Sequence, residues 1–333
     1  MTRQRRTAFT RLEALVVVAL LGVLFALGVP LVLRARLAAK RQQSENNLRQ
    51  LAEATIRYAE NDKRQLLPLG WDEKHFSTVA KLLPYLGEKD LYKTIDFSRS
   101  IDDPKNEAAR RTRLEVVLSP LDDEPVLGKD PTKVLAPTSY LFNGLAFPRG
   151  YSRRYPSSFI NGTSSTVFVA ETLRGDGRPR AVDVRRQHIV LSEHKARKYP
   201  AEKREEMGVA EFKSDVNVAA DRCSSWMDGR MLQGTFISGR ATPGIVDLRP
   251  DGRPEPPAWV HSGKRYPNDE RPDVVVQFSD QLDGLAAPRS LTSIILVGMG
   301  DGSVRRIDVD KLPSEQWMRG TDVDWCEGIS SEW

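Results

Sequence analysis

The sequence begins with a stretch that decides the architecture, TAFTRLEALVVVALLGVLFALGVPLVLRAR over residues 7–36, in which no residue from Ala14 to Leu33 is charged. As a helix, this uncharged run would rise by about 1.5 Å per residue and span roughly 30 Å, the thickness of a bilayer core. The apolar part of a secretory signal is usually shorter, about 7–15 residues. The stretch therefore predicts a transmembrane helix over residues 9–33. A plain signal anchor or an uncleaved signal peptide would fit the same pattern.

Basic residues flank the apolar run on both sides, so the positive-inside rule does not decide its orientation. They are Arg3, Arg5, Arg6 and Arg11 before the run, and Arg34, Arg36, Lys40 and Arg41 after it. The short N-terminal tail favours an N-terminus on the cytoplasmic side. The bulk of the chain, residues 65–333, is then expected to be exported.

After the apolar run the pattern becomes amphipathic. Apolar or small residues recur with helical spacing at Leu33, Leu37, Ser44, Leu48, Leu51, Thr55 and Tyr58. No Pro or Gly interrupts residues 31–63, and the Pro and Gly within residues 67–70 end the pattern. The spacing predicts one helix from about Leu12 to Arg64, on the order of 80 Å long. Its membrane half would continue into a stalk over residues 34–64 that packs on a globular head.

The composition of the chain indicates a folded protein. Of 333 residues, 40% are hydrophobic and 8% aromatic, which argues against disorder. The roughly 270 residues after the stalk suffice for one large or two small domains. The formal net charge is +5, but no basic stripe is interleaved with aromatic residues, so no nucleic-acid partner is expected. Cys223 and Cys326 could form a disulfide in an oxidising compartment or remain buried thiols.

The head is predicted to be α+β, with an antiparallel, β-rich globular fold. Short runs rich in β-branched residues predict strands at 114–118, 139–142, 166–170, 181–184, 234–238, 274–278, 294–297 and 304–309. Further predicted segments are a short helix within 76–83, an exposed helix or insertion at 192–206, and Pro-rich loops at 243–257 and 267–272. The Asp-Gly pairs at 251–252 and 301–302 predict tight hairpin turns, because Gly supplies the positive φ.

The segment Ala8-Phe9-Thr10-Arg11-Leu12-Glu13, followed by the apolar run, resembles the processing site of type IV prepilins and pseudopilins. The resemblance implies a leader over residues 1–8, which a prepilin peptidase removes between Ala8 and Phe9, and methylation of the new Phe9 amine. Glu13 then becomes the fifth mature residue, where the family carries an acid. A carboxylate in hydrocarbon is costly alone, but it can pair with the N-terminal amine of a neighbouring subunit during assembly. Pro30 falls where pilins carry a helix-bending proline.

Two residues depart from the prepilin pattern. Ala8 replaces the usual Gly before the cleavage site, a substitution that such peptidases are expected to tolerate. Arg11 replaces an apolar residue and adds a second charge near the start of the membrane helix. It is badly placed to neutralise Glu13, because residues two apart on a helix point to different faces. The pattern leaves the effect of Arg11 on processing and assembly open.

Residues 159–171 read FINGTSSTVFVAE, residues 300–305 read GDGSVR, and a segment from Trp317 to Trp333 follows. Together they resemble the I-x-D-G-T-S-N-T-I-x-x-x-E stretch, the A-D-G-S-V-R motif and the Trp-bounded tail of a large pilin-like family, domain of unknown function 1559. The conserved feature is backbone geometry, a Gly in each turn with β-branched residues after it. Structural turns are therefore expected at Asn161, Gly162, Asp301 and Gly302.

No pattern of catalytic residues emerges. His188 and His194, with Glu193 beside the second, match neither of the common zinc motifs. Leu291 stands where the resembled family usually carries a His, so any role of that His is absent from this chain. Three acids could offer oxygen ligands to Ca²⁺ but lack the full loop spacing, and a solvated tail is the alternative. They are Asp322, Asp324 and Glu327.

The sequence therefore favours a non-enzymatic pilin-like or pseudopilin-like structural protein, with no metal and no cofactor. It is expected to be a single-pass protein of the inner (cytoplasmic) membrane, with a cytoplasmic N-terminus and a periplasmic or extracellular head. Its expected partners are a prepilin peptidase, membrane lipid, and other pilin-like subunits in a pilus or a type II secretion pseudopilus. The alternative is a signal-anchored periplasmic ligand-binding or enzymatic domain, which uses the segment only as a tether.

Overall fold

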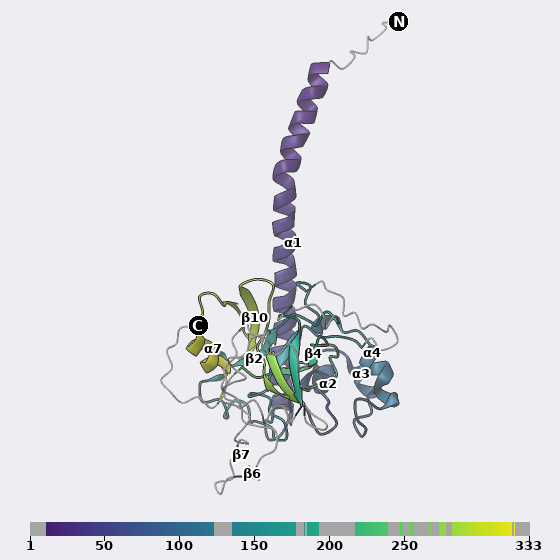
Figure 1. Ribbon diagram of the computed structural model, residues 1–333, viewed down its shortest axis with the longest axis vertical. Helices are drawn as coiled ribbons and strands as arrows, with labels where there is room; N and C mark the ends of the chain where they lie inside the picture. The colour runs from purple at the N-terminus through teal and green to yellow at the C-terminus, as the bar shows by residue number, and fades with distance from the viewer. Residues whose placement is uncertain are drawn as a thin grey trace.

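A long helix, α1, carries a head made of two main β-sheets and several short helices (Figure 1). The computed structural model describes residues 11–122, 135–177, 183, 185–192, 217–238, 247–248, 254–255, 267, 273–277, 282–321 and 323. Within α1, side chains are described at residues 15–22, 26 and 28–61. The architecture is α+β, as the sequence predicts.

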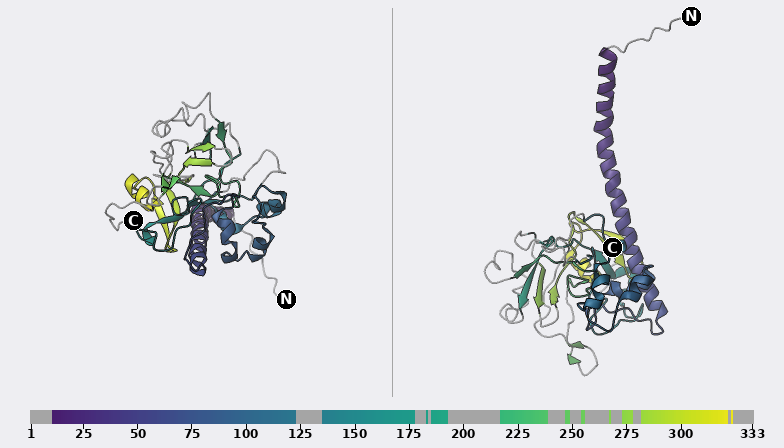
Figure 2. Two further views of the ribbon diagram at one scale, coloured as in Figure 1. Left: turned by 90° about the horizontal axis from the view of Figure 1, so that it is seen from below. Right: turned by 90° about the vertical axis from the view of Figure 1, so that its right-hand side faces the viewer.

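Helix α1 runs from Arg11 to Asn61, 51 residues, and continues through Pro30. Its N-terminal part projects from the head, and its C-terminal part lies against the head in all three views (Figures 1 and 2). The predicted long helix is confirmed, but it ends slightly before the predicted Arg64. Asp62 causes this end, because its Oδ1 accepts a hydrogen bond of 2.7 Å from the backbone N–H of Arg64 and caps a turn.

The projecting part of α1 exposes large apolar side chains, each 42–68% accessible to solvent. They are Leu15, Val16, Val17, Val18, Leu20, Leu21, Val29, Leu31, Val32, Leu33 and Leu37. A search of the described part of the chain found no helix of sufficient length and apolarity to span a membrane.

The C-terminal part of α1 buries one stripe, which includes Leu48, Leu51 and Thr55 at the predicted spacing. This stripe packs on strands β10 (Ile294–Met299) and β2 (Val167–Glu171). The contact is close at Gly298, where an added Cβ would lie 2.8 Å from Val169 Cγ1 and 3.3 Å from the carbonyl oxygen of Leu48. The helix therefore lies almost directly on the backbone of β10.

The sheet under α1 has five strands in the order β11-β10-β2-β1-β5. Its remaining strands are β1 (Tyr140–Asn143), β5 (Thr235–Phe236) and β11 (Val304–Asp308). Strands β1, β2, β10 and β11 pair antiparallel, whereas β1 and β5 are parallel. These strands confirm the five predicted segments from which they arise, with ends shifted by a few residues.

A second sheet of four strands, ordered β4-β3-β8-β9, lies on the side of the head remote from α1 (Figure 2). Its strands are β3 (His188–Ser192), β4 (Asn217–Ala219), β8 (Asp273–Gln277) and β9 (Leu282–Leu285). Strands β3 and β8 are parallel. The prediction of an antiparallel head is therefore wrong in part, because the head is mixed. Each parallel pair joins strands separated by a long connection, and strand patterns do not reveal such partners.

Short helices cover the flank of the head beside α1. They are α2 (Thr78–Leu82), η1 (Leu83–Tyr85), α3 (Lys89–Thr94), η2 (Pro104–Asn106), α4 (Glu107–Arg111) and η3 (Glu115–Val117). Helix α2 confirms the predicted short helix, and the Ser77 hydroxyl caps it by accepting from the N–H of Ala80 at 3.1 Å. The predicted strand at 114–118 is wrong, because these residues form the single turn η3.

Several predicted segments are described in part or not at all. The strand at 181–184 and the charged stretch at 192–206 fall almost wholly outside the described residues, as do residues 268–272. Within the predicted loop at 243–257, strands β6 (Asp247–Leu248) and β7 (Pro254–Glu255) form an antiparallel pair. They flank the predicted turn at 251–252, which itself is not described.

Candidate functional site at the motif junction and the stalk pocket

The predicted turn residues lie in two turns that contact each other. Gly162 (φ +79°) precedes the turn η5 (Thr163–Ser165), and Gly302 (φ +87°) lies between β10 and β11. The backbone N–H of Gly300 donates to the carbonyl of Thr166 at 2.9 Å, and Arg305 Nη2 donates to the carbonyl of Ser164 at 2.9 Å. Two motifs far apart in sequence thus form one hydrogen-bonded corner.

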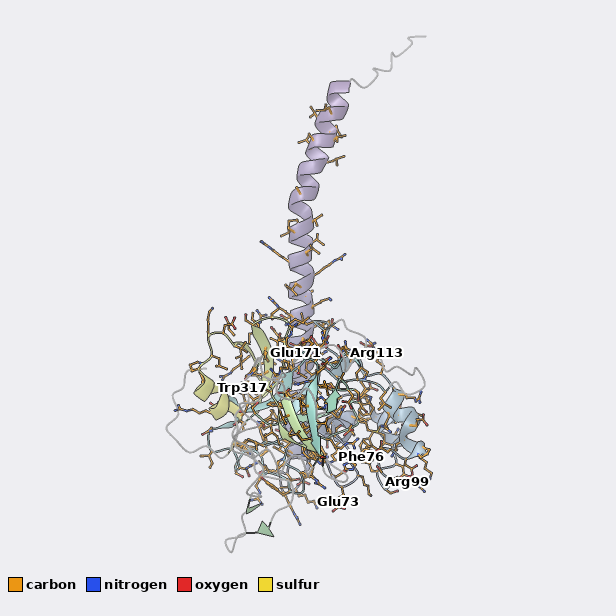
Figure 3. The ribbon with its side chains drawn as sticks, viewed as in Figure 1. Glu73, Phe76, Arg99, Arg113, Glu171 and Trp317 are labelled. Atoms are coloured by element: carbon orange, nitrogen blue, oxygen red, sulfur yellow. The ribbon has the colours of Figure 1, made fainter. Side chains whose placement is uncertain are left out.

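The start of the third motif, residues 317–321, lies beside the same corner. It forms the end of helix α7 (Ser314–Thr321), on which Figure 3 labels Trp317. The Trp317 side chain is fully buried and stacks on Phe236 with ring centroids 6.3 Å apart. Asn143 Nδ2 donates to the carbonyls of Val167 at 2.9 Å and Thr321 at 2.8 Å, joining α7 to two strands. Asn161 Nδ2 donates to the carbonyl of Arg319 at 3.4 Å. The junction consists of packing and of hydrogen bonds that side chains and one backbone N–H donate to backbone carbonyls.

The predicted processing and assembly residues lie mostly outside the part of the chain that the structure describes. Ala8 and Phe9 lie outside the described residues, as do Cys326 and the acids Asp322, Asp324 and Glu327. Glu13 lies in the projecting end of α1, where side chains are not described. Within the described residues, no group of three or more His, Cys, Asp or Glu could hold a metal ion.

Cys223 is buried and carries a free thiol in the structure. Burial raises the pKa of this thiol to about 12, so it is unreactive at neutral pH. Because Cys326 is not described, a disulfide between the two cysteines stays a prediction.

A pocket of about 190 Å³ lies beside α1 where the helix enters the head. Its walls are mostly apolar and come from α1, the end of β2, the start of β10 and the loop before β10. The lining residues are Leu37, Arg41, Leu121, Asp122, Glu171, Thr172, Leu173, Arg289, Ser290, Leu291, Thr292, Ile294 and Leu296. Leu291, which replaces the His of the resembled family pattern, is thus a pocket residue.

Glu171, labelled in Figure 3, lies at the end of β2 and supplies a carboxylate to the lining of this pocket. It accepts hydrogen bonds from Ser44 Oγ of α1 at 2.7 Å and from the hydroxyl of Ser119. The Ser44 hydroxyl also lies 2.9 Å from the hydroxyl of Tyr140. Burial raises the pKa of Glu171, against the opposing effect of the two serine hydrogen bonds. This polar group fixes α1 on the head and forms the polar end of a largely apolar pocket.

Two buried clusters, each of one carboxylate and two guanidinium groups, adjoin the pocket, which Arg289 of one cluster and Asp122 of the other help to line. Asp273, fully buried, contacts Arg222 and Arg289, with 2.7 Å between Asp273 Oδ1 and Arg289 Nη2. In the other cluster, Asp122 Oδ1 lies 3.0 Å from Arg186 Nη2, and Asp122 Oδ2 lies 3.3 Å from Arg174 Nε. Each carboxylate is thus placed between two guanidinium groups, an arrangement that compensates for the desolvation of all three.

His188 adjoins the Asp273 cluster at the start of β3 and is buried. Its Nε2 lies 3.7 Å from Asp221 Oδ1, and its Nδ1 has no hydrogen-bond partner among the described residues. Burial lowers the pKa of His188, so the imidazole is neutral at pH 7. Sequence reasoning considered this histidine only as a zinc ligand and missed both charge clusters. In each cluster one member lies 51 or more residues from the nearest other member along the chain, and no local motif marks the clusters.

The comparison with protein families decides the family. Residues 34–309 match the sequence profile of one family, described as protein of unknown function (DUF1559). The chain belongs to this family. The DUF1559 match begins in the stalk part of α1 and ends just after β11, so it includes both turn motifs but not the prepilin-like segment or α7. A search of curated proteins and a search of solved structures each returned no match.

Proposed function

We propose that this DUF1559 protein is a non-enzymatic, pilin-like structural protein anchored in the inner membrane. A prepilin peptidase cleaves it between Ala8 and Phe9, and its head lies on the exported side. The observation that supports this proposal best is the division of α1 into two parts. One continuous helix buries a stripe on the head at its C-terminal end and, among its described side chains, exposes apolar ones between Leu15 and Leu37.

The exposed apolar surface of α1 is expected to be buried against lipid or other protein. Eleven large apolar side chains, each at least 42% exposed, extend from Leu15 to Leu37 on a single helix. Burying apolar surface gains roughly 25 cal/mol per Å², so a bare helix of this kind is unfavourable in water. Lipid covers such a helix in the anchored subunit, and neighbouring helices cover it in an assembly.

Glu13 and Phe9 supply the proposed assembly contact. After cleavage, the Glu13 carboxylate of one subunit pairs with the methylated amine of Phe9 on a neighbour. A paired charge is much less costly in hydrocarbon than an isolated one. This contact assigns a use to the acid at the start of an apolar run.

The processing step is tested by the mass of the N-terminal peptide of the protein from its native membranes. An N-methylated peptide that begins at Phe9 is the expected result. A peptide with intact Met1, or one that starts after Pro30, would contradict processing by a prepilin peptidase.

The assembly step is tested with Glu13→Ala. This variant is expected to insert in the membrane and to be cleaved, but not to cross-link to neighbouring subunits in membranes. The matched control is Glu60→Ala, which removes an exposed acid from the other end of the same helix. Equal cross-linking in both variants would contradict the Glu13 pairing.

The pocket beside α1 favours a second candidate function, ligand binding by a tethered head. Its walls are largely apolar and carry both Arg41 and Glu171, so it suits a small amphiphile whose carboxylate pairs with Arg41 while its apolar chain lies against the leucines. Saturation-transfer NMR with hexanoate tests this function. Leu291→Trp, which fills the pocket, should abolish the signal, whereas Ile160→Trp, at an apolar residue 62% exposed elsewhere on the head, should keep it. No signal from the unmodified protein would count against ligand binding.

A further inference from the structure

Strand β11 forms an edge of the five-stranded sheet, and no described strand pairs with its outer side. On its inner side, the N–H of Met299 donates to the carbonyl of Ser303, and the N–H of Val309 donates to the carbonyl of Ser293. Hydrogen-bonded pairs alternate along an antiparallel ladder. The backbone N–H and C=O groups of Val304 and Arg306 therefore point outward.

A groove of about 470 Å³ runs along this free edge. Strand β11, the turn after it and helix α7 supply its walls, which are Arg305, Arg306, Ile307, Asp308, Lys311, Leu312 and Gln316. An edge strand beside a helix is the geometry in which an extended peptide adds to a sheet.

The groove carries an excess of positive charge. Three of its residues are basic, and Asp308 is its one acid. Arg306 contacts Glu45 of α1 yet remains 58% exposed, and Lys311 is 83% exposed beside Asp308. Leu312, which is half-buried, supplies apolar surface to the groove, whereas Ile307 is only 5% exposed there. The groove therefore complements an extended segment that alternates acidic and apolar residues.

We propose that the free edge of β11 binds an acidic, extended peptide segment of a partner protein by strand addition. The peptide backbone pairs with Val304 and Arg306, an apolar side chain contacts Leu312, and its carboxylates face Lys311 and the two arginines. This interaction is independent of the pilin-like proposal, because it uses only the head.

The test is fluorescence anisotropy on the full chain in detergent micelles, with a labelled heptapeptide that alternates valine and glutamate. Two peptides serve as controls, one with lysine in place of glutamate and one with methylated amide nitrogens that cannot donate to the sheet. The proposal expects binding of the glutamate peptide alone, weakened by added salt.

Protein variants separate the backbone contact from the charge. Arg306→Pro removes an outward N–H and leaves the ladder to β10 intact, and its matched control Arg306→Ala loses the same side chain but keeps the N–H. The Pro variant should bind about tenfold more weakly than the Ala variant, the value of one hydrogen bond. Lys311→Glu, which keeps the backbone unchanged, should also weaken binding.

Three results would overturn the proposal. Equal binding by the Pro and Ala variants, or by the N-methylated peptide, would exclude strand addition. Equal binding of the lysine peptide would exclude charge complementarity. Absence of any binding would mean that the arginines only protect the edge from pairing with other chains.

Discussion

At the residue scale, the head places its buried charges in compensating groups. Asp273 is in contact with two arginines that are themselves at most 1% exposed. Arg222 Nη2 also donates to Thr172 Oγ1 at 3.0 Å and to the carbonyl of Ala287 at 2.6 Å. Such a group contributes little to stability as a whole, but it is very sensitive to the loss of one member.

Asp273→Ala is therefore expected to destabilise the head strongly. It leaves two buried guanidinium groups without their carboxylate, and the free energy of unfolding should fall by about 3–5 kcal/mol. Denaturant unfolding of the full chain in detergent measures this loss. Asp90→Ala is the control, because the pair of Asp90 and Lys93 is 97% and 73% exposed and should cost less than about 1 kcal/mol. Similar losses in the two variants would contradict the compensating arrangement.

His188 makes the head sensitive to mild acid. Burial holds its pKa below the ordinary 6.5, so the unfolded chain takes up a proton first as the pH falls. The stability that neutral His188 contributes is present above pH 6.5 and is lost as the pH falls toward the lowered pKa. Relative to His188→Gln, the unmodified protein should lose up to about 1.4 kcal/mol per pH unit below 6.5. Parallel stability curves from pH 8 to pH 5 would show that His188 has no such effect.

At the residue scale, the sequence predicted correctly those positions whose role depends only on neighbouring residues in the chain. Gly162 and Gly302 occupy positive-φ turns, and a Gly beside Asn or Asp signals such a turn without knowledge of the fold. The partners of Asp273 gave no signal, because an arginine that will be buried looks like any other arginine in a chain with 50 basic residues. The pocket also could not be predicted from the sequence, because its walls come from segments far apart in the chain.

At the element scale, the contact between α1 and β10 determines how the stalk sits on the head. Gly298→Ala should reduce the free energy of unfolding by about 1–3 kcal/mol, because the new methyl group would crowd Val169 and the backbone of Leu48. Denaturant unfolding of the full chain in detergent measures this change. Gly22→Ala in the projecting part of α1 is the control, because its methyl group meets nothing within 4 Å and should cause no loss. An unchanged stability of Gly298→Ala would mean that the contact between α1 and β10 accommodates the added methyl group without cost.

Elements with strong periodicity were predicted well, and their partners were not. The helical spacing of α1 and the Asp-Gly turn between β10 and β11 identify those elements directly. Residues 114–118 have the composition of a strand, yet they form the turn η3, in which the N–H of Leu118 donates to the carbonyl of Glu115 at 3.1 Å. Tertiary contacts overrode the local preference there. The parallel pairing of β3 with β8 joins segments about 80 residues apart, and a single sequence does not encode it visibly.

At the scale of the whole molecule, the two parts of α1 should respond independently to substitution. Val18 is 68% exposed and belongs to the N-terminal part of α1, which projects from the head in Figure 1. Val18→Arg should leave denaturant unfolding of the head unchanged but increase the fraction extracted from membranes by alkaline carbonate. A charge at the centre of a membrane helix costs about 2.5–3.5 kcal/mol to insert. Gly22→Ala serves as control, and equal extraction of the two variants would contradict a membrane position for this part of α1.

A long N-terminal helix followed by a β-rich head was accessible from the sequence because each part has its own composition and period. The arrangement within the head was not, because it depends on which distant segments meet. The two-sheet structure, with α1 on one sheet and the other sheet remote from it, follows from contacts among single residues.

The hydrogen bonds of Asn143 have a consequence for how the protein is made. Its side chain joins β1 to Thr321, 178 residues later in the chain. At about 5–20 residues per second, a ribosome needs on the order of ten seconds or more to synthesise that interval. Until then Phe236 lacks the cover of Trp317, and the buried Asn143 amide lacks one of its two acceptors. Chains interrupted before α7 should therefore remain open to proteases, so that only full-length heads survive quality control.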